Sequence, residues 1–194
     1  MLSSKHINLY LMTQSSEPST RWKTIGAGVT KTFRIGWAMA AFEYRQAEEI
    51  RDSFARHEVR YLFIGKSGAI LLGFPDTTQD ADIFVEKSAE NGRRIVPALR
   101  ELGFTLSEPQ AVEIERGKDF IQLKNGPFDL DLIFAPDGIE TFADAWQRRI
   151  DVEGFPVCHI DDIIASKEAA GRGKDLESLP RLKSFRQYLA NRSA

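Results

Sequence analysis

Two pairs of aspartates, each separated by one residue, stand out in this sequence. Asp80-Ala81-Asp82 and Asp129-Leu130-Asp131 each lead directly into an apolar run. In a β-strand, residues i and i+2 point to the same face, so each pair would direct two carboxylates to one side. Hard oxygen ligands of this kind suit Mg²⁺ or Mn²⁺, and Mg²⁺ usually keeps positions for water and substrate phosphate. The two pairs therefore indicate a metal site for phosphoryl or nucleotidyl transfer.

The spacing alone does not identify a metal site, because the chain contains 28 Asp and Glu among 194 residues. About four acidic pairs with this spacing are expected from composition. Further examples occur at Glu113 and Glu115, Asp151 and Glu153, and Asp175 and Glu177. A carboxylate in such a pair can equally cap an element or pair with a cation. The sequence upstream of Asp80 supplies the context that separates the candidates.

A glycine-rich turn lies in that upstream segment. Arg60 to Ile64 has the pattern of a buried strand, Gly65-Lys66-Ser67-Gly68 follows, and Ala69 to Gly73 is typical of a short helical turn. Such a turn presents backbone N–H groups to an anion at a helix N-terminus, and glycine permits its close approach. Only a short link separates this segment from Asp80. The sequence thus predicts a triphosphate site beside a metal site.

In order and spacing, these parts resemble the nucleotidyltransferase superfamily that includes DNA polymerase beta. The resemblance is to its small members, which are found beside toxin-antitoxin and abortive-infection systems. In that family a strand and a Gly-Gly or Gly-Ser turn precede a short helix, an Asp-x-Asp strand follows, and a later strand carries a third acidic residue. Gly65 to Ser67 match the turn, Asp80 and Asp82 match the first strand, and Asp131 or Asp129 matches the third carboxylate.

The resemblance covers about Val59 to Leu182 and implies an enzyme that moves an NMP from an NTP to a hydroxyl of a protein or an RNA. It implies Mg²⁺ or Mn²⁺ as the cofactor and a toxin or antitoxin as a possible partner. The implied catalytic and metal-binding residues are Asp80, Asp82 and Asp131, with Asp129 as the other candidate for the third ligand. The implied nucleotide-binding residues are Gly65, Lys66, Ser67, Lys167 and Lys174.

Some of these residues have alternative interpretations. Lys66 stands where the family commonly has a second glycine, so it either contacts a phosphate as a point charge or alters the turn. Lys167 lies on a predicted amphipathic helix, where lysine is usually a solvated surface residue. Lys174 and Asp175 follow two glycines and could simply start the next helix, with Asp175 as its N-cap. The alternative function is a catalytically inactive nucleotide-binding or protein-interaction module of the same fold. A metal-dependent nuclease is less favoured, because it would give the glycine turn no purpose.

Composition favours one compact domain, since 42% of the residues are hydrophobic and the length is sufficient for a sizeable core. The single cysteine, Cys158, excludes an internal disulfide and fits a reducing compartment. No apolar stretch approaches the roughly 20 residues of a membrane span, so we expect a cytoplasmic protein without a membrane partner. The formal net charge of -2 excludes an overall basic surface for nucleic acid.

The predicted fold class is α+β, with a nucleotidyltransferase-like mixed β-sheet flanked by helices and a C-terminal helical segment. Residues 1–36 are expected to form an N-terminal tail of uncertain order, and residues 37–194 the domain, with its C-terminal helices from about 160. The patterns predict helices at about 37–57, 90–102 and 139–149, and strands at about 111–116, 119–124, 128–134 and 155–159. The strands between 111 and 134 predict a meander. A shared metal requires the Asp80 strand to lie beside the Asp131 strand.

Overall fold

The computed structural model describes residues 42–193, so the predicted tail of residues 1–36 and the start of the first predicted helix lie outside the described residues. The helices are α1 (Tyr44–Arg56), α2 (Gly65–Leu71), α3 (Ala89–Glu101), α4 (Glu108–Glu115), α5 (Phe142–Arg148), α6 (Ile160–Ala170) and α7 (Gly173–Ser193). The strands are β1 (Tyr61–Phe63), β2 (Asp80–Val85), β3 (Phe120–Leu123), β4 (Asp129–Ile133), β5 (Ile150–Val152) and β6 (Phe155–Val157). Within the described range, no helix is both long and apolar enough to cross a membrane.

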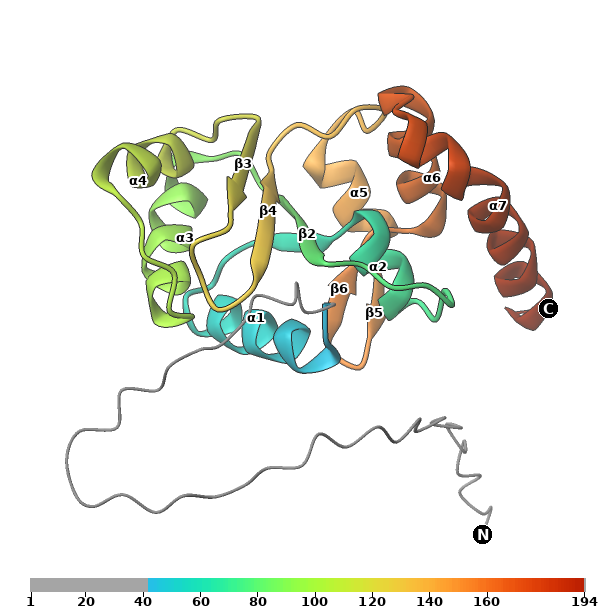
Figure 1. Ribbon diagram of the computed structural model, residues 1–194, viewed down its shortest axis with the longest axis horizontal. Helices are drawn as coiled ribbons and strands as arrows, with labels where there is room; N and C mark the ends of the chain where they lie inside the picture. Colours follow the sequence, from blue (N-terminus) through green and yellow to red (C-terminus); the bar gives the residue numbers. More distant parts are fainter. Residues whose placement is uncertain (1–41, 194) are drawn as a thin grey trace, which may run out of the picture. The chain divides into compact units, whose positions relative to one another are not determined.

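The strands form one mixed sheet in the order β3-β4-β2-β1-β6-β5 (Figure 1). The pairs β2 with β4 and β1 with β6 are parallel, and the other neighbouring strands are antiparallel. This arrangement confirms the predicted α+β class and the mixed sheet. It also confirms that the two acidic strands are neighbours. They pair in register, with Asp80 opposite Asp129 and Asp82 opposite Asp131.

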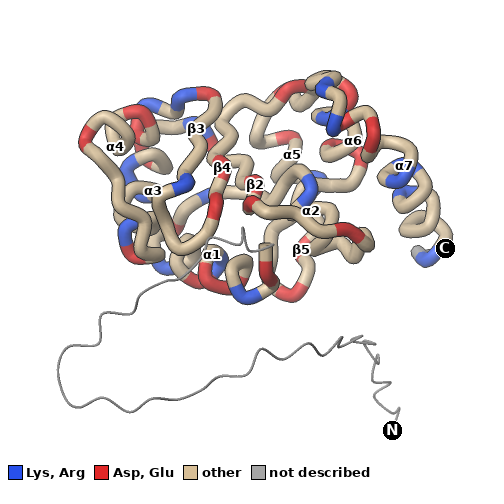
Figure 2. Tube along the Cα trace, in the orientation of Figure 1, with Lys and Arg blue, Asp and Glu red and all other residues tan. Residues whose placement is uncertain are grey.

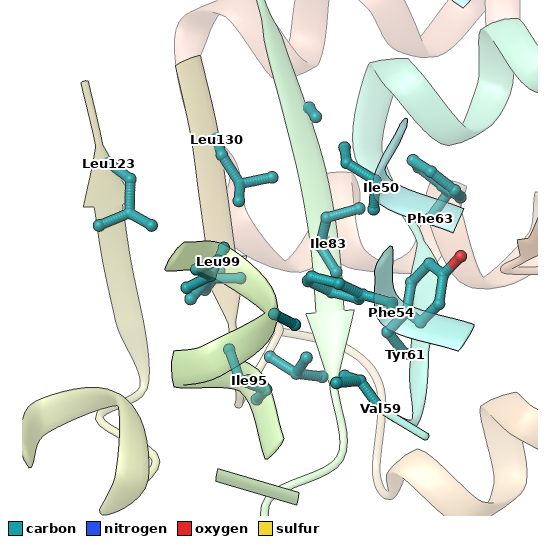
Figure 3. Packing of buried hydrophobic residues seen from close by; sticks show 14 of the residues in the cluster. Ile50, Phe54, Val59, Tyr61, Phe63, Ile83, Ile95, Leu99, Leu123 and Leu130 are labelled. Carbon is teal, nitrogen blue, oxygen red and sulfur yellow. The ribbon is translucent and has the colours of Figure 1, made fainter. Parts of the chain in front are cut away.

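Helices pack on both faces of the sheet, and the alternation of side chains along each strand divides the core in two. On one face, residues such as Ile83 and Leu130 join a buried cluster with α1, α3 and α4, and Figure 3 shows part of this packing. On the other face, Phe84 joins a second cluster with α2, α5, α6 and α7. Because Asp80 and Asp82 have the same parity as Phe84, their side chains point to this second face. The apolar face therefore anchors the strands while the acidic face remains available for chemistry.

One predicted strand is wrong. Residues 111–115 belong to α4 and Arg116 is its C-cap, so none of them forms a strand. The only hairpin in this described region is β3 with β4, and the meander is not formed. Ser107 caps the helix through a capping box with Gln110. The buried residues are Ala111 and Ile114, which are three apart as in a helix. The local alternation of Val112 to Glu115 resembled a strand, but capping and the i, i+3 burial determine the structure.

Two further boundaries differ from expectation. The segment Gly65-Lys66-Ser67-Gly68 is the first turn of α2 and not a separate turn that precedes a helix. Strand β5 was not predicted, and it forms a hairpin with β6. The turn of that hairpin holds Glu153 and Gly154 with positive φ angles of 49° and 84°, a combination typical of a two-residue hairpin turn. The final helix α7 contains Pro180 within its length.

Candidate active site

Three carboxylates converge where β2 and β4 lie side by side. Asp80, Asp82 and Asp131 each offer one oxygen, and these oxygens all lie within 4.8 Å of one another. Figure 2 shows acidic positions on both neighbouring strands. Asp129, the other candidate for the third carboxylate, pairs with Asp80 across the strands but is not a member of this cluster. The in-register parallel pairing is therefore what brings the acidic groups together.

Hydrogen bonds hold two of the carboxylates in place. The hydroxyl of Thr78 donates to Asp80 Oδ1 over 2.8 Å, and the backbone N–H of Lys66 donates to Asp82 Oδ2 over 3.2 Å. The hydroxyl of Ser67 is buried; it donates to the carbonyl of Ile64 over 3.1 Å and accepts from the backbone N–H of Asp82 over 2.9 Å. The first turn of α2 is thus bonded directly to the acidic end of β2.

Gly65 is required at its position for two reasons. Its φ of +61° lies in the left-handed region, which side chains disfavour. A Cβ atom added there would lie 2.3 Å from Asp82 Oδ2, which is far inside van der Waals contact. The glycine therefore lets the start of α2 approach the carboxylate, and this contact explains why a glycine stands between β1 and α2.

The electrostatics of the cluster favour a cation. Burial, together with the neighbouring carboxylates of Asp80 and Asp131, raises the pKa of Asp82 from 3.8 to about 7. Burial also raises the pKa of Asp131, although the side chain of Gln122 on the adjacent strand counteracts the effect. Asp131 Oδ1 is buried and has no hydrogen-bond partner among residues 42–193. Adjacent carboxylates with raised pKa values and a free buried oxygen are the donor set expected for a divalent cation.

A cavity of about 160 Å³ opens in front of the carboxylates. It brings together six of the residues predicted from sequence, namely Gly65, Lys66, Asp80, Asp82, Lys167 and Lys174. Ser67 does not line the cavity, because its hydroxyl is used inside the protein. The lining also includes Thr78, Arg172 and Asp175, which sequence reasoning did not assign to the site. Lysine and arginine thus face the acidic cluster across one small space.

Asp175 lines the cavity beside Lys167, Arg172 and Lys174 and is fully buried. Its carboxylate accepts from Lys167 Nζ over 2.8 Å and from Arg172 Nε over 2.6 Å. Burial alone would raise the pKa of Asp175, but the hydrogen bonds from Lys167 and Arg172 lower it below its usual value. Arg172 and Asp175 form a local pair three residues apart, whereas the pair with Lys167 joins α6 to α7 and depends on how these helices pack.

Lys66 has a looser ionic environment than Lys167. Its ammonium lies 3.9 Å from Asp76 Oδ2. The same Asp76 oxygen accepts from Arg181 on α7 over 2.9 Å, and Arg181 also donates to the carbonyl of Pro75 over 2.7 Å. The loop after α2 is therefore tied to α7, and Lys66 is left at the rim of the cavity.

The fold is similar to that of the lincosamide antibiotic adenylyltransferase LnuA, solved with lincomycin bound, with a TM-score of 0.55 and 16% sequence identity over 75% of this chain and 99% of LnuA. The chain has a nucleotidyltransferase fold. The antibiotic-resistance factor ANT(2'')-Ia overlaps with a TM-score of 0.49 and 16% identity over 78% of this chain and 95% of that protein. No family model matches the sequence, and no curated protein matches it.

Proposed function

We propose that this protein is a metal-dependent nucleotidyltransferase that moves an NMP from an NTP to a hydroxyl of a protein or an RNA, within a toxin-antitoxin system. The observation that carries the proposal is the convergence of Asp80, Asp82 and Asp131, two of which, Asp80 and Asp82, line one cavity together with lysine and arginine side chains. The nucleotidyltransferase fold supports the same conclusion. The wider sequence resemblance supports the toxin-antitoxin context.

The carboxylate cluster fits a divalent cation. Asp80, Asp82 and Asp131 would hold it, because their oxygens already lie within 4.8 Å of one another and Asp131 Oδ1 has no other partner among the described residues. Mg²⁺ or Mn²⁺ bound there would neutralise phosphate charge and lower the pKa of the acceptor hydroxyl. Asp129, beside this cluster, remains the alternative third ligand of the proposal.

Cationic side chains in the cavity would bind the triphosphate. Lys66, Lys167, Arg172 and Lys174 line the cavity and would bind the phosphate oxygens. In the proposed reaction, the acceptor hydroxyl releases its proton to water, its oxygen forms a bond to the α-phosphorus, and the bond from that phosphorus to the pyrophosphate oxygen breaks. These side chains would stabilise the negative charge of the departing pyrophosphate, which is greatest after that bond breaks.

The acceptor would approach from the side of β3. Gln122 on β3 is opposite Asp131, and Phe120 is opposite Ile133 on the same face. Both β3 side chains are exposed, and Phe120 retains 48% of its accessible surface. An exposed phenyl ring on the same face as Asp131, one cross-strand pair further along, provides a surface on which an acceptor can rest. A small hydroxyl compound of the antibiotic class is the competing acceptor, because LnuA was solved with lincomycin.

A catalytically inactive nucleotide-binding or protein-interaction module of the same fold is the alternative. It is favoured by the departure at Lys66, whose side chain lies toward Asp76. The alternative predicts that NTPs or a protein partner bind without metal-dependent turnover. The proposed enzyme instead requires both release of pyrophosphate and transfer of the label.

The proposal is tested by incubating the protein with each of the four α-³²P-labelled NTPs and Mg²⁺ or Mn²⁺. Parallel reactions contain cellular RNA, a cell lysate, or lincomycin as a small hydroxyl acceptor. Label on an RNA, a protein band or the small molecule that is lost in Asp80→Asn and Asp82→Asn supports the enzyme and identifies its acceptor class. NTP binding by calorimetry without any label transfer supports the inactive module.

A further inference from the structure

Asp175 is a buried carboxylate whose side-chain partners among the described residues, Lys167 and Arg172, both line the cavity. Its side chain is 1% exposed, and that of its partner Lys167 is 13% exposed. Its second partner, Arg172, has a largely exposed side chain and also lines the cavity. The alternative interpretation of Asp175 as an N-cap is wrong, because α7 begins at Gly173 and Asp175 is the third residue of the helix. The carboxylate is therefore placed to act on the two cations.

Lys167 has acidic groups on two sides. Asp175 holds its ammonium over 2.8 Å, and Asp80 and Asp82 line the same cavity as Lys167. A lysine side chain is long and flexible, and it would turn toward the acidic cluster if Asp175 no longer held it. In that position its ammonium would compete with a divalent cation for the same oxygens. Asp175 therefore determines on which side of the cavity the ammonium lies.

We propose that Asp175 is a positioning residue that orients Lys167 and Arg172 toward the triphosphate and keeps Lys167 away from the carboxylates of Asp80 and Asp82. This inference rests on the proposed NTP-binding function of the cavity. It assigns Asp175 a role in nucleotide affinity that acts through its neighbours, since Asp175 itself carries the wrong charge to bind phosphate. Arg172 becomes a nucleotide-binding residue in addition to the lysines.

The test compares Asp175→Asn with the wild type by calorimetric binding of ATP, CTP, GTP and UTP in Mg²⁺, and by KM and kcat for the NTP that is turned over. Ordering a released lysine side chain weakens binding by about tenfold. We therefore expect the dissociation constant and KM to rise by about tenfold, with a smaller change in kcat. Half-maximal activation should also require more Mg²⁺.

Glu168→Gln is the matched control. Glu168 on α6 accepts from Lys183 on α7 over 2.6 Å, so the variant removes an ion pair between the same two helices away from the cavity residues. We expect its NTP affinity to equal that of the wild type. Asp175→Glu provides a second variant should Asp175→Asn not fold, because it keeps the charge but displaces the ammonium. We expect it to raise the dissociation constant as well.

A double-mutant cycle tests whether Asp175 acts through Lys167. In a Lys167→Met background, Asp175→Asn should weaken NTP binding by less than threefold. Unchanged NTP affinity in both Asp175 variants, together with a lowered melting temperature, would overturn the inference and leave the ion pair a purely structural role. Different results refute the inference and the proposed function. A wild-type protein that binds NTP without transferring label refutes catalysis, whereas the NTP dissociation constants of the Asp175 variants still decide the role of Asp175.

Discussion

Replacing Asp82 with asparagine should stabilise the protein without metal while it removes catalysis. The pKa of Asp82 is raised from 3.8 to about 7 because the carboxylate is buried beside Asp80 and Asp131. Between these two pH values the folded state binds more protons than the unfolded state, so stability falls as the pH rises through the window. At about 1.4 kcal/mol per pKa unit, the full penalty above pH 7 is at most about 4 kcal/mol.

Asparagine removes this charge but keeps an oxygen that can accept from the N–H of Lys66. Its amide NH₂ group loses water on folding, which offsets part of the gain by about 1–3 kcal/mol. We therefore expect Asp82→Asn to raise the free energy of unfolding by about 1–3 kcal/mol at pH 8. At pH 4 the wild-type carboxyl is protonated, so only the cost of the amide remains and the variant should be no more stable than the wild type. Urea denaturation at both pH values, in the presence of EDTA, measures the difference.

The exposed residue Asp137 supplies the control, because Asp137→Asn removes the same charge away from the cluster. Its stability should follow the wild type at both pH values. With Mg²⁺ added in place of EDTA, the wild type should gain more stability than Asp82→Asn, since ligand bound only to the folded state stabilises it. An Asp82→Asn variant whose stability relative to the wild type is the same at pH 4 and pH 8 would refute the electrostatic reasoning.

Three further outcomes are expected. Because Asp82 must be deprotonated to bind metal, Mg²⁺ affinity should weaken by up to about tenfold per pH unit below pH 7, which Mg²⁺ titrations of turnover between pH 5.5 and 8 would measure; a flat profile would contradict this. Gly65→Ala should lower the unfolding free energy, measured by urea denaturation, by about 1–3 kcal/mol from its positive φ alone. It should also reduce turnover, measured by label transfer, because the new methyl group contacts Asp82. The control Gly73→Ala, with open space around its Cβ, should leave turnover unchanged. Leu132→Ala, in the core beneath Asp131, should cost about 2–5 kcal/mol of stability; a loss below 1 kcal/mol in urea denaturation would show that β4 is not packed as described.

The two acidic strands could be predicted from patterns among residues that are close together in the sequence. Asp80 and Asp82 precede an apolar run with strand periodicity, and Asp129 and Asp131 do the same, so a common face could be predicted for each pair. Their pairing in register was expected only because a shared metal requires it. Gly65 was also recognisable, since a glycine between a strand and a helix marks an unusual backbone or a close approach.

Other parts depend on contacts between distant segments and left no local signal. Asp175 resembles an ordinary residue of a first helical turn, yet the packing of α7 on α6 buries it against Lys167. The apparent alternation of residues 111–116 misled because α4 buries Ala111 and Ile114 on one side. A serine hydroxyl such as that of Ser67 suits a phosphate contact, but here it accepts a hydrogen bond from the backbone N–H of Asp82.

The exposed face of β3 bears on the fidelity of the proposed reaction. Phe120 and Gln122 are exposed on β3, opposite Ile133 and Asp131 respectively, so water can reach the reacting phosphate by the route that the acceptor would use. Active sites that suppress hydrolysis do so by excluding water when the substrate is bound. On the side of β3, the bound acceptor itself would therefore have to keep water away from the reacting phosphate. Wasteful cleavage of NTP to NMP and pyrophosphate should then be fastest when no acceptor is present, and the correct acceptor should suppress it.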